Sequence, residues 1–161
     1  MSMIICGLLW FAVISIGLMG GVYFTFSAFV MRSLDVIEKP AGMLAMQSIN
    51  RIIQRSTFLP LFFASTLVCI ALAIVAALDL SEPAALATLA GSLLYVVGMF
   101  VVTVAFNVPL NNALEATNAD SPDGDAMWGR YMQRWTVWNH VRTLSCTGAF
   151  ALLILALVQS A

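Results

Sequence analysis

The chain alternates between long uncharged apolar stretches and shorter polar segments. Four stretches contain no Asp, Glu, Lys or Arg, and they run over Met1–Met31, Ser56–Leu78, Pro83–Val108 and Thr143–Ala161. A helix needs about 20 apolar residues to cross the roughly 30 Å hydrocarbon core of a bilayer. Each stretch meets or approaches this length, and the fourth extends backwards through the aromatic segment Trp135–Trp138. The pattern predicts four helices over about residues 3–31, 56–79, 83–112 and 128–159.

Backbone groups within a bilayer must be hydrogen-bonded inside the protein, which favours helices for these stretches. The alternation with a period of two that is typical of membrane β-strands does not occur. We therefore expect an all-α fold, a single domain over residues 1–161 that forms a four-helix transmembrane bundle. The first stretch lacks a basic N-terminal region and is about twice as long as the apolar core of a signal peptide, so we expect it to be retained.

The basic residues predict the orientation of the bundle. All seven lie in two of the three loops or just inside the fourth helix, and they are Arg32, Lys39, Arg51, Arg55, Arg130, Arg134 and Arg142. The remaining loop, Asp79–Pro83, carries no basic residue. Because positively charged loops stay in the cytoplasm, both termini are expected on the outer side.

The two basic loops are also the long ones. Residues Arg32–Arg55 have room for a short amphipathic interfacial helix around Ala41–Gln54. Residues Asn111–Arg134 include an acidic, turn-rich sequence at positions 120–125, which predicts a solvated loop.

Composition agrees with the membrane interpretation. Hydrophobic residues make up 61% of the chain and charged residues 9%, whereas a soluble domain has about 25% charged residues. We expect a multi-pass integral membrane protein, of the kind found in the bacterial inner or cytoplasmic membrane, with the lipid bilayer as its main partner. The net charge of −1 and the lack of a basic stripe argue against nucleic-acid binding.

Metal and cofactor motifs are missing from the sequence. Cys6, Cys69 and Cys146 are far apart in apolar stretches, and none belongs to a CxxC pair. His140 is the only histidine, so a bis-histidine haem has no second ligand. Phosphate-binding loops and nucleophile elbows are also missing. We expect no metal and no cofactor.

A polar cluster is predicted where the third and fourth helices approach the basic side. Asn107 and Asn111 are four residues apart and share a helix face. Pro109 lacks a backbone donor and disturbs the helical hydrogen bonds around Ala105. A stripe on the fourth helix adds Trp128, Tyr131, Trp135, Trp138, Asn139 and Arg142.

Arg142 is the deepest charge of the fourth helix, and a guanidinium at such a depth is costly unless it is paired or wetted. Asn50, Asn107, Asn111 and Asn139 are the amides available to surround it. Two interpretations stay open. The cluster forms a ligand pocket, or it is a structural clasp in which asparagines join helices, aromatic residues anchor the interface and the arginine extends to the headgroups.

These residues carry a resemblance to a known family. The segment Asn107–Leu114, followed by Trp128, Tyr131, Trp135, Trp138–Asn139 and Arg142, resembles the anthrone-oxygenase-like family of small membrane proteins. Residues Gly20–Met31 and Met46–Asn50 fit the same family, so the resemblance extends over nearly the whole chain.

The resemblance implies a cofactor-independent oxygenase that converts an anthrone into an anthraquinone with dioxygen. It implies that Arg142, Asn107 and Asn139 stabilise the oxyanion of a flat phenolic substrate. Asn50, Asn111, Trp128, Tyr131, Trp135 and Trp138 are the expected substrate-binding residues. His140 has the side chain best suited to proton transfer near neutrality, although it lies about 100° around the helix from Asn139.

Other classes of function stay open from the sequence. A non-catalytic lipid- or small-molecule-binding protein, or a subunit of a larger membrane complex, fits the same residues. A transporter or channel is disfavoured because four helices are few and the helices carry no carboxylate for proton coupling. Gly17 and Gly21 have the spacing of a helix-packing motif, which leaves a homo-oligomer as an open alternative.

Overall fold

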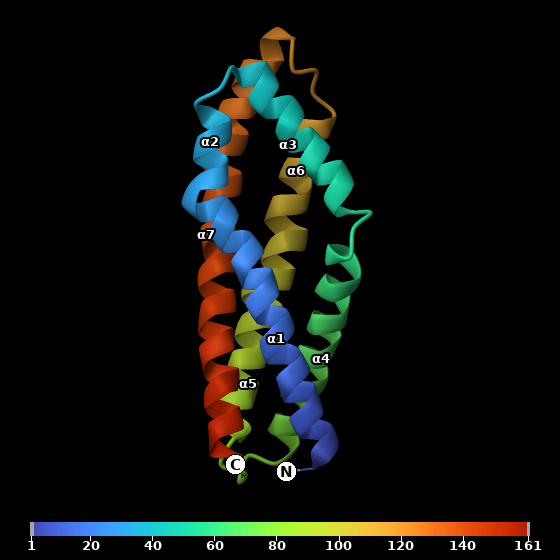
Figure 1. The fold of residues 1–161 in the computed structure, drawn as a ribbon, viewed down its shortest axis with the longest axis vertical. Helices are drawn as coiled ribbons and strands as arrows, with labels where there is room; N and C mark the ends of the chain where they lie inside the picture. Colours follow the sequence, from blue (N-terminus) through green and yellow to red (C-terminus); the bar gives the residue numbers. More distant parts are fainter. Residues whose placement is uncertain (1, 161) are drawn as a thin grey trace.

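A computed structural model describes residues 2–160, and all regular elements in this range are helical. Four long helical rods run side by side along the molecule, and both ends of the chain lie at its lower end in Figure 1. The rods cover Met3–Asp35, Phe58–Leu78, Ala85–Glu115 and Pro122–Gln159, and each is long and apolar enough to cross a membrane. The predicted all-α, four-helix fold is confirmed. The outward orientation of the termini stays a prediction.

Two of the rods are interrupted by π-helical segments. The first comprises α1 (Met3–Thr25), η1 (Phe26–Val30) and α2 (Met31–Asp35). The third comprises α5 (Ala85–Tyr95), η2 (Val96–Val101), η3 (Thr103–Asn107) and α6 (Val108–Glu115). The second and fourth rods are the uninterrupted helices α4 (Phe58–Leu78) and α7 (Pro122–Gln159). The short helix α3 (Lys39–Ile53) links the first and second rods.

The bundle has two hydrophobic cores, one above the other. The lower core, which we call the membrane half, joins α1, α4, α5 and the last half of α7 through residues such as Leu9, Ile16, Cys69 and Leu153. The upper half joins α2, α3, α6 and the first half of α7 through Met31, Met43, Met46, Leu110, Leu114, Ala119, Trp128, Tyr131 and Trp135.

Helix lengths place the membrane boundary between these halves. About 20 residues of helix cross the hydrocarbon core. About twenty residues counted upwards from the lower end of each rod reach Tyr23 on α1, Val104 on η3 and the Asn139–Arg142 turn of α7. On the second rod the same count reaches Phe58, the first residue of α4. The upper half therefore projects beyond the hydrocarbon, which explains why it is helical and yet rich in polar residues.

The expected long loop at residues 111–134 is largely helix. Helix α6 continues to Glu115 and α7 begins at Pro122, so the connection is only residues 116–121. Proline fits the first turn of a helix, and Asp123 and Asp125 interact favourably with its dipole. Polarity here marks helix outside the membrane rather than a loop.

The amphipathic helix expected around residues 41–54 is confirmed as α3. It buries Gly42, Met43, Met46, Gln47 and Asn50 against the upper half. A Cβ on Gly42 would collide with the backbone oxygen of Leu34, so this close approach requires glycine. Gln47 fixes α3 over the end of α6, since its amide nitrogen donates to the carbonyl oxygens of Leu114 (2.8 Å) and Thr117 (3.1 Å).

Candidate functional site

The π-helical segments η1 and η3 lie near the level of the membrane boundary, and η2 lies just below it. In η1 the Met31 amide donates to the carbonyl of Phe26, and after η3 the Val108 amide donates to that of Thr103. Such wide turns release carbonyl oxygens from the usual helical ladder and are frequent at functional sites. The carbonyl oxygen of Tyr23, just before η1, accepts a 2.8 Å hydrogen bond from the side-chain amide of Asn139.

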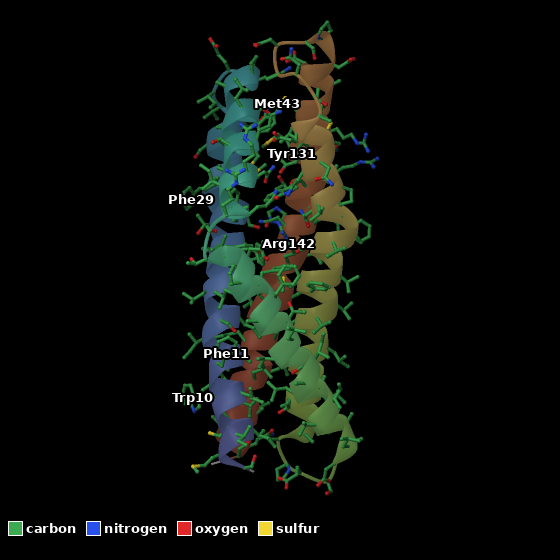
Figure 2. The ribbon with its side chains drawn as sticks, turned by 90° about the vertical axis from the view of Figure 1, so that its right-hand side faces the viewer. Trp10, Phe11, Phe29, Met43, Tyr131 and Arg142 are labelled. Carbon is green, nitrogen blue, oxygen red and sulfur yellow. The ribbon has the colours of Figure 1, made fainter. Side chains whose placement is uncertain are left out.

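Arg142 lies at this level and points into the bundle (Figure 2); its side chain is only 5% exposed. Its Nη2 donates to Oδ1 of Asn139 at 2.8 Å, and its Nη1 donates to Oγ1 of Thr103 at 3.4 Å. The guanidinium carbon lies 4.3 Å from the centre of the Tyr23 ring and 5.0 Å from that of Trp135, both favourable cation–π distances. Neutral groups thus hold the cation in place.

No carboxylate neutralises Arg142 within the described residues. The two ion pairs found there, Lys39–Asp125 and Arg51–Glu115, are exposed and lie in the upper half. The Nε atom of Arg142 is buried without a hydrogen-bond partner. An unpaired buried charge is strongly unfavourable. The arrangement is therefore suited to an anionic group that is not part of the protein.

A cavity of about 360 Å³ adjoins this arginine. Its walls come from α1, α3, α4, η3–α6 and α7, so that every rod contributes. Arg142, Tyr23, Thr103 and Trp135 form the inner end, while Phe58, Leu59, Phe62 and Phe63 of α4 form an apolar wall. A charged end and an apolar wall together suit an amphipathic anion with a flat or chain-like apolar body.

Two of the expected amides reach the cavity. Asn50 and Asn111 both line it. Nδ2 of Asn50 is buried without a partner, and Oδ1 of Asn111 accepts a 2.8 Å hydrogen bond from the hydroxyl of Tyr131. Buried polar groups normally have partners, so the unpaired donor of Asn50 is a second group that a ligand oxygen could satisfy.

The other two amides support the cavity from behind. Asn107 is fully buried and donates to the carbonyl oxygen of Trp135 at 3.3 Å, which ties η3 to α7. Asn139 donates to the Ser27 hydroxyl at 2.7 Å and to the Tyr23 carbonyl. These two bonds orient the Asn139 amide so that its oxygen faces Arg142. Neither asparagine lines the cavity.

His140 lies on a different face from the cavity. It is exposed, and its Nδ1 is 2.9 Å from the hydroxyl oxygen of Ser27. It borders a shallow surface depression shared with Arg32 and Asp35. The structure therefore does not bring His140 together with Arg142, and the Ser27 hydroxyl stands between it and Asn139.

The aromatic stripe divides into three groups. Trp135 lines the cavity. Tyr131 stacks on Trp135 and Trp128, with ring centroids 5.7 and 6.0 Å apart, and all three belong to the upper core. Trp138 lies outside this stack, and its ring stacks on the ring of Phe106 with the two centroids 3.7 Å apart. Of the six expected substrate-binding residues, Asn50, Asn111 and Trp135 thus reach the cavity, whereas Trp128, Tyr131 and Trp138 do not.

Tyr23, Thr103 and Ser27 belong to the site but were not predicted from the sequence. Each is a hydroxyl-bearing residue within an otherwise apolar stretch. Serine and threonine hydroxyls in such stretches usually bond to their own helix backbone, and a tyrosine there is usually part of the apolar core. The distinguishing signal was the shared depth of Tyr23, Thr103 and Arg142 when counted from the lower helix ends. That depth depends on knowing the helix bounds.

A comparison with protein families identifies the chain's relatives. Residues 46–152 match the sequence profile of the anthrone oxygenase family, which is well over half of the chain. The chain belongs to the anthrone oxygenase family. This match confirms the resemblance drawn from the asparagine and tryptophan motifs.

The matched part of this anthrone oxygenase family member runs from α3 to α7 and contains Asn50, Thr103, Asn111, Trp135 and Arg142. It begins after α1, so the resemblance over residues 20–31 stays a prediction. A search of curated proteins and a search of solved structures each gave no match.

Proposed function

We propose that this protein binds a lipophilic phenolic or anthrone-like substrate as its oxyanion at Arg142 and oxidises it with dioxygen, without a cofactor. The observation that carries the proposal is the buried guanidinium of Arg142, which has no carboxylate partner among the described residues and borders a cavity at the membrane boundary. Membership of the anthrone oxygenase family supports the reaction class.

The residues around the cavity suit the chemistry of an enolate. The positive charge of Arg142 favours the ionised form of a bound phenol or enol. The unpaired Nδ2 of Asn50 offers a further donor to the developing oxyanion, and preorganised donors of this kind lower the barrier to enolate formation. Loss of one proton from the methylene carbon of an anthrone gives this enolate.

The electron-rich enolate then reduces dioxygen, and a carbon–oxygen bond forms at the former methylene carbon to give a hydroperoxide. Loss of the second proton from that carbon breaks the oxygen–oxygen bond. One oxygen atom stays as the quinone carbonyl and the other leaves as water. Atoms and electrons balance without another reactant, and the cavity's part is to hold the anion beside Arg142.

A non-catalytic binding protein is the second candidate, and one observation favours it. Among the described residues that line the cavity, none is a carboxylate or an imidazole that could accept the substrate proton. In that case the cavity would hold a lipophilic anion without changing it. We also propose that the protein resides in a bacterial inner membrane, in keeping with its basic loops.

The decisive experiment uses 1,8-dihydroxyanthrone with the protein in lipid vesicles. We expect oxygen uptake and formation of the corresponding anthraquinone in equal amounts for the wild type. Arg142→Lys should keep the fold and lose turnover, because an ammonium does not reproduce the planar fork of a guanidinium. Binding of the anthrone without oxygen uptake would establish the binding-protein alternative. Failure of the wild type to bind it would contradict both candidates.

A further inference from the structure

Several side chains that line the Arg142 cavity also face the surroundings of the bundle. Phe63 on α4 is 49% exposed, and Val104 on η3 and Val108 on α6 are 52% and 39% exposed. All three are apolar and lie near the membrane boundary estimated from the helix lengths. The cavity therefore reaches the lipid-facing surface between α4 and the η3–α6 segment.

Two other sides of the membrane half, between α1 and α7 and between α5 and α7, are closed by tight helix packing. A Cβ added to Gly20 of α1 would lie 3.1 Å from Cys146 of α7, and one added to Gly91 of α5 would lie 3.0 Å from Leu152 of α7. Backbones this close leave no room for a molecule to pass. The α4 side differs, because α4 begins only at Phe58, and in the side view of Figure 2 its upper end lies away from the rod that carries α5 and α6.

We propose that the substrate enters the cavity sideways from the bilayer, through an opening between α4 and η3–α6. The lower edge of this opening is apolar and consists of Leu59, Phe63 and Val104, whereas its upper edge carries the amides of Gln54 and Asn112. This division matches the change from hydrocarbon to headgroups across the membrane boundary.

The opening selects the ligand by its partition into lipid. A weakly acidic phenol or enol dissolves in the bilayer in its neutral form, passes the apolar edge and ionises beside Arg142. A permanently charged, water-soluble anion has no equivalent path over Leu59 and Phe63, because dehydration of a charge at an apolar edge is costly. The inference rests on the proposed ligand site and adds its route and substrate class.

A labelling experiment tests the route independently of any ligand. Thr103→Cys places a thiol at the inner end of the cavity, and in vesicles it should react readily with lipid-soluble pyrene maleimide and slowly with a charged, water-soluble thiosulfonate. Leu59→Trp narrows the opening and should slow the pyrene maleimide reaction about fivefold or more. Phe63→Ala widens the opening and should accelerate this reaction. Mass spectrometry separates the label at position 103 from that on the native cysteines.

Leu67→Trp is the matched control, because Leu67 lies on the same face of α4 one turn below Phe63, is 64% exposed and does not line the cavity. Leu67→Trp should leave the rate of the pyrene maleimide reaction at position 103 unchanged. Equal rates for Leu59→Trp and the control, or faster reaction with the charged reagent, would overturn the lateral route even if anthrone turnover is intact. The expected labelling pattern together with absent anthrone binding would instead contradict the proposed function and leave the route standing.

Discussion

Arg142 and Asn139 form a 2.8 Å hydrogen bond between the guanidinium Nη2 and the amide Oδ1, one turn apart on α7. The Asn139 amide is itself held by the Tyr23 carbonyl and the Ser27 hydroxyl, at 2.8 and 2.7 Å. The bond fixes the position of the guanidinium but brings no negative charge to it. Position and charge are thus controlled separately, and the charge stays available to a ligand.

The first prediction supplies the missing negative charge from the protein. Thr103→Asp places a carboxylate beside Nη1 of Arg142, which already contacts the Thr103 hydroxyl at 3.4 Å. The internal ion pair should lower the affinity for 1,8-dihydroxyanthrone about tenfold or more while the melting temperature is kept. The measurements are ligand titration and thermal unfolding in detergent.

Thr103→Asn is the neutral control for this substitution. It has nearly the same shape as aspartate and no charge, so the affinity should stay close to that of the wild type. Equal loss of affinity in both variants would mean that the shape of position 103 matters and that the charge of Arg142 does not.

The second prediction concerns the unpaired amide of Asn50. Asn50→Leu removes a buried donor that has no protein partner, so the melting temperature should stay the same or rise. Affinity for the anthrone should fall about fivefold, the effect of one lost hydrogen bond. Gln47→Leu should lower the melting temperature and leave the affinity unchanged, because Gln47 bonds two carbonyls and does not line the cavity. A lower melting temperature for Asn50→Leu would indicate that its amide serves the fold.

The third prediction makes Ser27 a positioning residue. Ser27→Ala removes one of the two acceptors that hold the Asn139 amide, and the resulting freedom of Arg142 should reduce turnover about fivefold with little change in melting temperature. Ser33→Ala serves as a control, because its hydroxyl bonds to the Phe29 carbonyl on its own helix. Unchanged turnover in Ser27→Ala would show that Arg142 needs no such support.

The fourth prediction concerns His140, which the family resemblance implied as a proton carrier. Since His140 is exposed and does not line the cavity, His140→Ala should keep turnover within about twofold of the wild type across pH 5–8. The check is the pH profile of oxygen uptake by both proteins. Loss of an ionisation near neutrality in the variant would assign the proton transfer to His140 after all, through the Ser27 hydroxyl.

The fifth prediction concerns orientation. Both termini are expected outside, so alkaline phosphatase fused after Ala161 should be active. The same reporter inserted in the segment that joins α6 to α7 should be inactive. The reverse result would contradict the interpretation of the seven basic residues.

Much of the fold could be predicted because a bilayer imposes simple requirements on a sequence. The uncharged stretches marked the four helices, and the pattern around residues 41–54 marked α3. The part from Asn111 to Arg134 was misjudged as a loop because helices that leave the membrane become polar without ending. Apolar patterning measures contact with lipid, and so it cannot locate the end of a helix in water.

The candidate site was predictable only in part. Arg142 and Asn50 could be found, since a deep charge and an amide near a membrane boundary both require partners. Tyr23 and Thr103 could not, because which face of a long apolar helix points inward depends on its packing. The separation of His140 from Asn139 follows from helical geometry, whereas the bonds from both side chains to Ser27 needed the tertiary structure.

The segments η1, η2 and η3 have a consequence for how insertions and deletions act on this protein. A π-turn holds one residue more than the α-turn that it replaces, and each residue of an α-helix adds about 100° of rotation. Deletion of a single residue from Phe26–Val30 would therefore let this segment close into ordinary α-turns and leave α2 in nearly the same rotational position relative to α1. The same deletion within the regular part of α1 would rotate the whole of α2 by about 100°. A one-residue gap should therefore be tolerated at a π-segment and should disturb the site when it falls elsewhere in the same rod.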